Sequence, residues 1–333
     1  MKAMVLNSCQ SIEQEPLKLT ERKIPPLQHH QVLIEVNACG VCRTDLHTVE
    51  GEIIPPSLPI IPGHEVVGRI VKRGAKVHQK NIGDRVGVPW FYSSCGECSY
   101  CRQNRENLCS RARYTGFNVD GGYAEFMAAH VKSCYLLPDN YQDIEIAPLL
   151  CGGVVGYRAF RLSDINPGQI LGLYGFGSSA HIILQVAKFL QITTFVFTRS
   201  SPHRHQAELL GADWVGPPQQ PPPELHHSAV VFTPAGESVP LALSNTRKGG
   251  IVSLGGIYMS DIPSFKYNLL WEERQVRSTA NSTPQDVNDF LNFARTHKIT
   301  SVVETFPLDS ANQVLTKVKH SQLPAGAVLV MDD

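Results

Sequence analysis

The pattern of apolar and polar positions divides the chain into two regions. Up to about residue 150, short apolar runs such as QVLIEV at 31–36 alternate with glycines, among them Gly68, Gly74 and Gly83, which is typical of β-strands joined by turns. From Gln169 the pattern changes to strand, glycine turn and helix, as in QILGLYGFGSSAHIILQVAKFL, followed by the strand TTFVFT. This alternation of strands and helices predicts a parallel sheet.

The same alternation continues to the end of the chain. We expect a helix around His205 to Leu210 that ends at Gly211, and buried strands in SAVVFTP and GGIVSLGG. An amphipathic helix is expected in PQDVNDFLNFARTH, and a closing helix and strand in SANQVLTKVKH and AVLVMDD. The prolines of GPPQQPPP at 216–223 exclude regular structure, so this segment is predicted to be a surface loop.

Length and composition fit a folded protein with two domains. The 333 residues exceed the usual size of one compact domain, and 42% of them are hydrophobic against 18% charged. Thirty basic residues balance thirty acidic ones, which argues against nucleic acid or a membrane surface as a partner. The start MKAMVLNSCQ lacks an apolar signal core, and no apolar run approaches the roughly 20 residues of a membrane helix, so we expect a cytoplasmic protein.

Four of the nine cysteines lie close together with the spacing C-x2-C-x2-C-x7-C: Cys95, Cys98, Cys101 and Cys109. Disulfide frameworks belong to small secreted domains, so metal binding is the better explanation. Four thiolates so placed can enclose one tetrahedral zinc ion and leave no open coordination position, which predicts a structural zinc site. An iron–sulfur cluster is the alternative, but the bacterial motif of that type has a shorter last interval and a following proline.

A second set of possible ligands is dispersed along the chain. It consists of Cys42 in CGVCRTDLH, His64 and Glu65 in PGHEVVG, and Cys151 in LLCGG. Catalytic zinc uses three protein ligands and keeps a fourth position open, and two thiolates with one imidazole meet that requirement. Taken singly, such residues are more often part of a packed core, and Cys39 with Cys42 also fits a redox pair, although no thioredoxin-like context surrounds it.

The glycine turn GFGSSA fits the dinucleotide-binding pattern G-x-G-x-x-G/A. It follows a predicted strand and precedes a predicted helix, so the amides at the helix start can face a pyrophosphate. Glycines also form tight turns in proteins that bind no nucleotide, and the strand and helix context is therefore what supports the prediction. The residues concerned are Gly175, Phe176, Gly177, Ser178, Ser179 and Ala180.

The end of the next strand bears on the choice of nucleotide. Enzymes that use NAD place Asp or Glu there to bind the ribose 2′-hydroxyl, whereas this chain has Thr198, Arg199 and Ser200. Hydroxyls and a guanidinium suit a 2′-phosphate, and Arg204 on the following helix can add a second charge. The sequence therefore favours NADP over NAD. A solvated arginine on a loop is the alternative.

Four motifs in the same order resemble the zinc-containing alcohol dehydrogenases of the medium-chain dehydrogenase/reductase superfamily: GVCRTDLH, GHEVVGRI, the four-cysteine segment and GLYGFGSSAH. The resemblance extends across nearly the whole chain. It implies that Cys42, His64 and Cys151 bind a catalytic zinc and that Glu65 can approach the metal. It also implies that Asp45 supports the imidazole of His64 and fixes its tautomer.

The resemblance assigns roles to further residues around this zinc. Thr44 hydrogen-bonds the alcohol, and His47 passes the alcohol proton through the cofactor ribose to solvent. Zinc lowers the pKa of bound water to about 7, and the same Lewis acidity favours loss of the proton of a bound alcohol. Many relatives carry an arginine near the C-terminus that touches the cofactor phosphates, where this chain has Ala325 and Gly326, so phosphate contact is expected to rest on Arg43 and the helix amides.

The architecture that the resemblance implies is α/β with two domains. A β-rich GroES-like catalytic domain covers 1–152 and 290–333 and includes a zinc lobe at about 93–112. A doubly wound Rossmann domain covers 153–289. We expect a homo-oligomer, dimer or tetramer, with two zinc ions per chain and a substrate site between the domains.

The expected activity is the interconversion of primary alcohols and aldehydes by hydride transfer with NAD(P). Trp90 is expected to narrow the alcohol pocket, although an aromatic residue there also fits a core position. Two alternatives are a non-catalytic NADP-binding zinc protein of the same fold and a zinc-finger-like nucleic-acid binder. The presence of all three catalytic ligands argues against the first, and zero net charge argues against the second.

Overall fold

The chain folds into two units, which we describe separately. The computed structural model describes residues 1–323 and 326–331. Unit 1 comprises Met1–Cys151 and Thr283–Asp333, and unit 2 comprises Gly152–Ser282. The chain returns to unit 1 just before helix α8 (Pro284–Thr296), whereas a boundary at 290 would cut through that helix.

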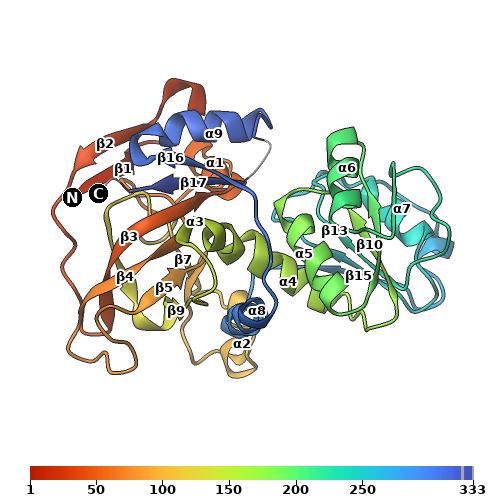
Figure 1. Ribbon diagram of the computed structural model, residues 1–333, viewed down its shortest axis with the longest axis horizontal. Helices are drawn as coiled ribbons and strands as arrows, with labels where there is room; N and C mark the ends of the chain where they lie inside the picture. The colour runs from red at the N-terminus through yellow and green to blue at the C-terminus, as the bar shows by residue number, and fades with distance from the viewer. Residues whose placement is uncertain (324–325, 332–333) are drawn as a thin grey trace. The chain divides into compact units, whose positions relative to one another are not determined.

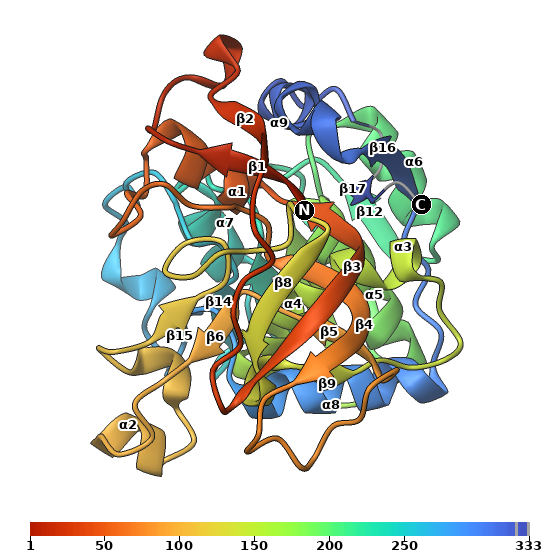
Figure 2. The same cartoon turned by 90° about the vertical axis from the view of Figure 1, so that its left-hand side faces the viewer.

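Unit 1 is built on a mixed sheet, which has seven strands among the described residues. Its order is β16-β17-β3-β4-β5-β9, and β8 pairs with β3 beside this path. Figure 2 shows β8, β3, β4, β5 and β9 side by side. The strands of this sheet are β3 (Gln31–Val41), β4 (Glu65–Arg73), β5 (Arg85–Val88), β8 (Phe126–His130), β9 (Tyr135–Leu136), β16 (Val303–Pro307) and β17 (Gly326–Val330).

Strand β3 is longer than the apolar run at 31–36 predicts. The residues that extend it, NACGV, include polar and small side chains, so their sequence carries no strong strand signal. They form a strand because they pair on one side with β4 and on the other with β17. The extension delivers the chain to Cys42, at the start of helix α1 (Arg43–Glu50).

The remaining elements of unit 1 surround this sheet. Helix α9 (Ala311–Lys319) lies close to β16 in Figure 1 and packs against α1. Its buried apolar residues Val314 and Leu315 belong to the same core cluster as Val49 of α1. The other regular elements of this unit are β1 (Lys2–Leu6), β2 (Leu17–Glu21), β6 (Phe91–Ser93), α2 (Ser99–Arg102), β7 (Arg113–Tyr114) and α3 (Asp143–Ile146).

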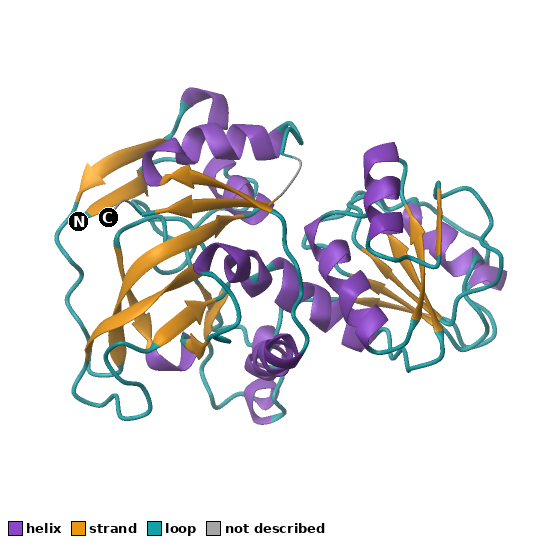
Figure 3. Cartoon of the chain, in the orientation of Figure 1, coloured by secondary structure: helices purple, strands orange, loops and turns teal. Residues whose placement is uncertain are grey.

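Unit 2 contains a six-stranded sheet in which every pairing is parallel. Its order is β12-β11-β10-β13-β14-β15. Helices α4 and α5 lie on one side of this sheet and α7 on the other, as Figures 1 and 3 show. The strands are β10 (Ile170–Tyr174), β11 (Thr193–Phe197), β12 (Trp214–Gly216), β13 (Ser228–Val231), β14 (Ile251–Leu254) and β15 (Gln275–Ser278), and the helices are α4 (Gly152–Leu162), α5 (Ser178–Phe189), α6 (Ser201–Leu209) and α7 (Ser238–Ser244).

The predicted α/β fold class is confirmed, with one shifted helix. Helix α6 begins at Ser201, earlier than the predicted start near His205, because the Ser200 hydroxyl caps the helix and Pro202 fits its first turn. The proline-rich segment after Gly216 has no helix or strand, as predicted. Among the described residues, none of the helices has the length and apolar character needed to cross a membrane.

Candidate active site

Three segments of unit 1 bring the dispersed ligand candidates together. Cys42 is the residue before helix α1, and His64 and Glu65 stand at the start of β4. Cys151 follows the short 3-10 helix at Ala147–Leu150. One ligand atom from each of these four residues lies within 4.8 Å of the other three. We call this group the Cys42 site.

The distances within the Cys42 site fit a zinc ion. The Sγ atoms of Cys42 and Cys151 are 3.8 Å apart, and His64 Nε2 is 3.3 Å from the Cys151 Sγ. In a tetrahedral site with Zn–S of about 2.3 Å, two sulfur ligands lie roughly 3.8 Å apart, and sulfur and nitrogen ligands slightly closer. Two thiolates and one imidazole therefore can hold zinc here and leave one position open.

Asp45 holds two of these ligands at once, the side chain of His64 and the backbone of Cys42. Its carboxylate is 1% exposed and accepts hydrogen bonds from His64 Nδ1 at 2.8 Å and from the Cys42 amide at 2.9 Å. It also accepts from the Tyr123 hydroxyl at 3.1 Å and from the Gly63 amide at 3.2 Å. Because Nδ1 of His64 donates to Asp45, Nε2 is left as the metal-binding atom.

Tyr123 is a member of the site that sequence reasoning missed. Its ring is fully buried, and burial followed by the Asp45 charge raises its pKa well above the usual range, so its hydroxyl remains a donor. No spacing rule connects it to Asp45, which is 78 residues away along the chain.

Burial and close contacts shift the pKa values of the groups in the Cys42 site. A hydrogen bond from Cys151, with further help from His64, holds the pKa of Cys42 well below its usual value despite burial. Burial alone would lower the pKa of His64, but the Asp45 carboxylate outweighs it and raises that pKa. Burial raises the pKa of Glu65, and the Cys42 charge adds to the effect. The site thus combines a thiolate with a carboxyl group that resists ionisation.

Thr44 and His47 follow Cys42 on helix α1. The Thr44 Oγ1 lies 3.8 Å from the Cys42 Sγ, so its hydroxyl is at the metal pocket. His47 is 16% exposed in its side chain, and its Nδ1 contacts the carboxylate of Glu52. Glu52, the partner of His47, is a second residue that the sequence analysis missed, after Tyr123.

Trp90 lies against the metal-binding imidazole. Its ring centroid is 4.8 Å from that of His64, in an edge arrangement, and its side chain is 8% exposed. Tyr114 stacks on it at 5.3 Å and Phe117 lies at 5.8 Å. These contacts place Trp90 beside the Cys42 site and hold its ring in a fixed orientation.

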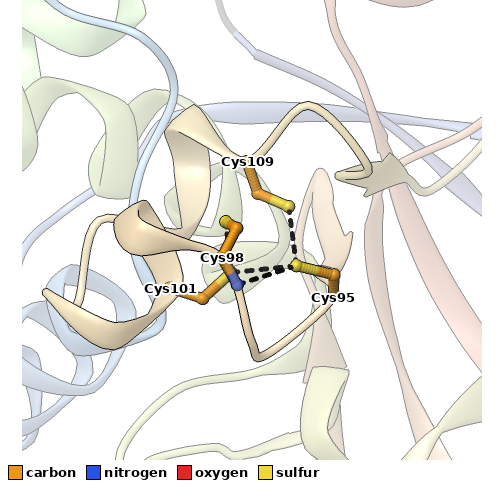
Figure 4. Close-up of side chains that lie close together, drawn as sticks. All are labelled: Cys95, Cys98, Cys101 and Cys109. Carbon is orange, nitrogen blue, oxygen red and sulfur yellow. Dashed lines mark hydrogen bonds between the residues drawn. The ribbon is translucent and has the colours of Figure 1, made fainter.

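The four clustered cysteines converge on a point in a separate lobe, residues 91–114, which we call the cysteine lobe. Figure 4 shows their side chains pointing toward one another. The Sγ–Sγ distances are 3.8 Å for Cys95–Cys101 and 3.5 Å for both Cys98–Cys101 and Cys95–Cys109. These separations match the edges of a zinc–thiolate tetrahedron and are far longer than a disulfide bond of about 2.05 Å.

Backbone amides favour the thiolate form of Cys95 in this cluster. Amide hydrogen bonds from Glu97 and Cys98 lower the pKa of the Cys95 thiol to about 6, so it is a thiolate at neutral pH. The Cys109 Sγ accepts a bond from the Arg111 amide at 3.4 Å. A closed set of four thiol ligands with no place for substrate indicates a structural role.

The predicted nucleotide turn has the geometry that the motif requires. Gly175 has a φ of +87°, and a Cβ there would stand 3.0 Å from the Thr233 amide, so only glycine fits. A Cβ built at Gly177 meets no described atom within 4 Å, which means that the backbone faces open space. Among the described residues no side chain caps the start of α5, so its first amides are available to an anion.

The residues that follow β11 differ in exposure and in their hydrogen-bond partners. Thr198 is buried, and Ser200 caps helix α6. Arg204 donates from Nη1 to the carbonyl oxygens of Thr198 at 3.1 Å and Arg199 at 2.8 Å, so this side chain holds the turn together. The exposed Arg199 is the remaining cation of the set.

Arg43 has partners within unit 1. Its Nη2 donates to the carbonyl oxygens of Val318 and Lys319, both at 3.2 Å, at the C-terminal end of α9. These bonds use Nη2 alone, and a guanidinium has five N–H donors, so the other nitrogens can still donate to a phosphate. Of the two residues that replace the C-terminal arginine of many relatives, Ala325 lies outside the described residues and Gly326 is the first residue of β17.

Comparisons with known proteins indicate the family of this chain. The family model described as the alcohol dehydrogenase GroES-like domain matches residues 28–139. The "Probable alcohol dehydrogenase AdhA" of Mycobacterium tuberculosis is 40% identical over 322 residues, 95% of this chain and 93% of that protein. An alcohol dehydrogenase of Geobacillus stearothermophilus is 34% identical over the full length of both chains. The solved alcohol dehydrogenase of Aeropyrum pernix matches 99% of this chain and 100% of its own, with a TM-score of 0.87 at 26% identity.

Proposed function

Because this chain belongs to the zinc-dependent alcohol dehydrogenases of the medium-chain dehydrogenase/reductase superfamily, we propose that its Cys42 site interconverts primary alcohols and aldehydes. The enzyme is an oxidoreductase for alcohols and aldehydes. The donor set carries the assignment of the site: two thiols and an imidazole, with a carboxyl group, whose ligand atoms lie within 4.8 Å of one another. Three such ligands on zinc leave a position for substrate oxygen.

We assign each ligand a role from its contacts. Cys42, His64 and Cys151 would hold the catalytic zinc, which would supply Lewis acidity to the substrate oxygen. Asp45 keeps the His64 ring oriented with Nε2 toward the metal. Glu65 belongs to the same group and would lie within reach of this metal. A second zinc in the cysteine lobe completes two per chain.

The proton lost in alcohol oxidation leaves along helix α1. Thr44 Oγ1 lies at the metal pocket and accepts the substrate proton in a hydrogen bond. His47 lies one turn further along α1 and passes the proton to solvent, since its side chain is partly exposed. Aldehyde reduction uses the same groups in reverse.

We propose NADP(H) as the preferred cofactor. The open backbone at Gly177 and the uncapped start of α5 suit a pyrophosphate. The turn at 198–200 carries no carboxylate to repel a 2′-phosphate, and Arg199 is exposed there. Arg204 contributes indirectly, by holding the backbone of this turn.

One experiment tests the activity, the metals and the cofactor together. Steady-state rates are measured for a panel of primary and secondary alcohols and their carbonyl products, with NADPH and NADH, on enzyme whose zinc content is known. We expect turnover of primary alcohols and aldehydes, two zinc ions per chain and a higher kcat/KM with NADPH. Absence of turnover with every substrate would refute the function, and a preference for NADH would refute the cofactor assignment alone.

We further propose a homo-oligomer, a dimer or tetramer, in the cytoplasm. Strand β15 ends the sheet of unit 2, and exposed apolar side chains lie in the segment before it: Ile257, Tyr258, Tyr267 and Trp271. An exposed strand edge beside apolar side chains favours association with a second copy. Light scattering measures the mass of the oligomer, and Trp271→Glu should reduce association.

Thiolate metal sites also need a reducing compartment, which supports the cytoplasm as the location.

A further inference from the structure

The contact between His47 and Glu52 is produced by the turn that ends helix α1. Gly51 adopts the left-handed conformation, with φ at +79°, and the Ile53 amide donates to the His47 carbonyl at 3.2 Å. This turn folds the chain back along the helix, so the Glu52 carboxylate reaches His47 Nδ1. The Glu52 side chain is 59% exposed and the His47 side chain 16%.

The other charged groups of α1 and its neighbours bind elsewhere. Lys319 of α9 donates to Glu13 and Glu50, both at 2.8 Å, and His320 lies 3.5 Å from Glu13. Asp45 is occupied by His64, and Arg43 by the carbonyls that end α9. Within residues 1–323 and 326–331, Glu52 is therefore the carboxylate that meets His47.

A carboxylate at Nδ1 has two chemical consequences for an imidazole. A neutral imidazole carries one N–H, and an acceptor at Nδ1 keeps the hydrogen there, which leaves the lone pair on Nε2. The negative charge also stabilises the imidazolium that forms when Nε2 accepts a proton. The same arrangement makes Asp45 the partner of His64 in the Cys42 site.

We propose that Glu52 is a positioning residue for the proton pathway: it holds His47 in the Nδ1–H tautomer, so that Nε2 accepts the proton arriving from Thr44. In alcohol oxidation His47 gains that proton at Nε2, keeps the hydrogen shared between Nδ1 and Glu52, and then loses the proton from Nε2 to water. The proposal rests on the proposed function, which places His47 in the pathway.

The first test is the pH profile of kcat/KM for alcohol oxidation. Glu52→Gln keeps an acceptor but removes the charge, so the acid limb of the profile should move to lower pH. The plateau should fall about three- to tenfold, while KM for the cofactor changes less than about twofold. Glu50→Gln is the matched control, because Glu50 binds Lys319, and its acid limb should stay where the parent's lies.

The double variant distinguishes positioning from a structural role. In a His47→Gln background, Glu52→Gln should move neither the limb nor the plateau, because Glu52 acts through His47. An equal effect in both backgrounds would overturn the proposal, and so would an unshifted limb in Glu52→Gln alone.

Nitrogen-15 NMR of the imidazoles gives a readout that needs no turnover. His47 is assigned by the signal missing in His47→Gln, and at pH 8 it should carry its proton on Nδ1 in the parent. Glu52→Ala should raise the population of the Nε2–H tautomer severalfold. A parent without dehydrogenase activity would refute the proposed function but not this tautomer, whereas an Nε2–H tautomer in the parent would refute the role of Glu52.

Discussion

Asp45 shows how one carboxylate orients two metal ligands, His64 and Cys42. It accepts four hydrogen bonds, including one from the His64 ring and one from the Cys42 amide, in a fully buried position. Asp45→Asn would place either an amide donor or an uncharged acceptor against His64. We expect zinc affinity at the Cys42 site to fall about 10- to 100-fold. Competition with a calibrated chelator measures this, and zinc in the cysteine lobe should be retained.

Cys42→Ser tests the catalytic centre directly. The change removes one of two thiolates from the open site and leaves the cysteine lobe intact, so we expect one zinc per chain, no measurable turnover and an unchanged circular dichroism spectrum. Cys39→Ser is the control, because Cys39 is buried three residues earlier but belongs to neither metal group. Alcohol oxidation that survives Cys42→Ser would mean that the catalytic centre lies elsewhere.

Arg199→Asp tests the choice of cofactor. A charge-assisted hydrogen bond contributes about 1.5 to 3 kcal/mol, which corresponds to a ten- to hundredfold preference for the 2′-phosphate. We expect KM for NADPH to rise by about that factor, with little change in KM for NADH or for the alcohol. Arg204→Gln is the comparison: because Arg204 holds the backbone of this turn, it should affect both cofactors. Equal effects of Arg199→Asp on the two cofactors would contradict a specific phosphate contact.

At the scale of elements, we expect the fold of the cysteine lobe to depend on a metal. The lobe contains two short strands and short helical turns, so four sulfur–metal bonds would supply most of its order. Cys109→Ser should release the structural zinc and lower the melting temperature by about 5 °C or more. In a domain of the size of unit 1, a loss of 1 kcal/mol in the free energy of unfolding lowers the melting temperature by roughly 2 to 4 °C. Differential scanning calorimetry with metal analysis measures both.

The control for this prediction is Cys9→Ser, a change at a partly exposed cysteine that belongs to neither metal group. It should leave zinc content and melting temperature unchanged. A Cys109→Ser enzyme with both zinc ions and the parent's melting temperature would show that the lobe needs no metal.

The elements that the sequence predicted well are those with a local signal. The strand, glycine turn and helix at 170–189 follow from apolar periodicity, and the cysteine lobe follows from its spacing. The second half of β3 was not predictable in this way, because its partners β4 and β17 lie far along the chain. Tyr123 was missed for the same reason, since it lies 78 residues from Asp45. Glu52 lies only five residues from His47, but their contact depends on the turn at Gly51, which helical periodicity does not predict. The bonds from Arg204 to the backbone carbonyls of its own turn likewise have no signal in the sequence.

At the scale of the whole molecule, buried neutral histidines make the stability of the protein depend on pH. Burial lowers the pKa of His226 in unit 2 to about 3, while Tyr174 and Thr246 hydrogen-bond its ring. The unfolded chain takes up a proton below a pKa of about 6.5, and the folded chain does not until about pH 3. The contribution of His226 to stability therefore falls as the pH falls below 6.5, by roughly 1.4 kcal/mol per unit, or about 2 kcal/mol at pH 5.

Urea unfolding at several pH values tests this. His226→Gln should lower stability at pH 7.5 yet flatten its decline toward pH 5, while His205→Gln, at an exposed position on α6, should leave the slope as in the parent. His181, whose pKa burial lowers to about 4, contributes a second and smaller part of the decline. An unchanged slope in His226→Gln would mean that this histidine is not responsible.

The unequal sulfur content of the two metal groups gives each a distinct optical signature. The cysteine lobe offers four thiolates and the Cys42 site two. Cobalt(II) accepts the same ligands as zinc but absorbs light through thiolate-to-metal charge transfer, which grows with the number of sulfur donors. A cobalt-loaded chain should therefore show two spectra of different intensity, so that the filling and exchange of each site can be followed separately in one solution.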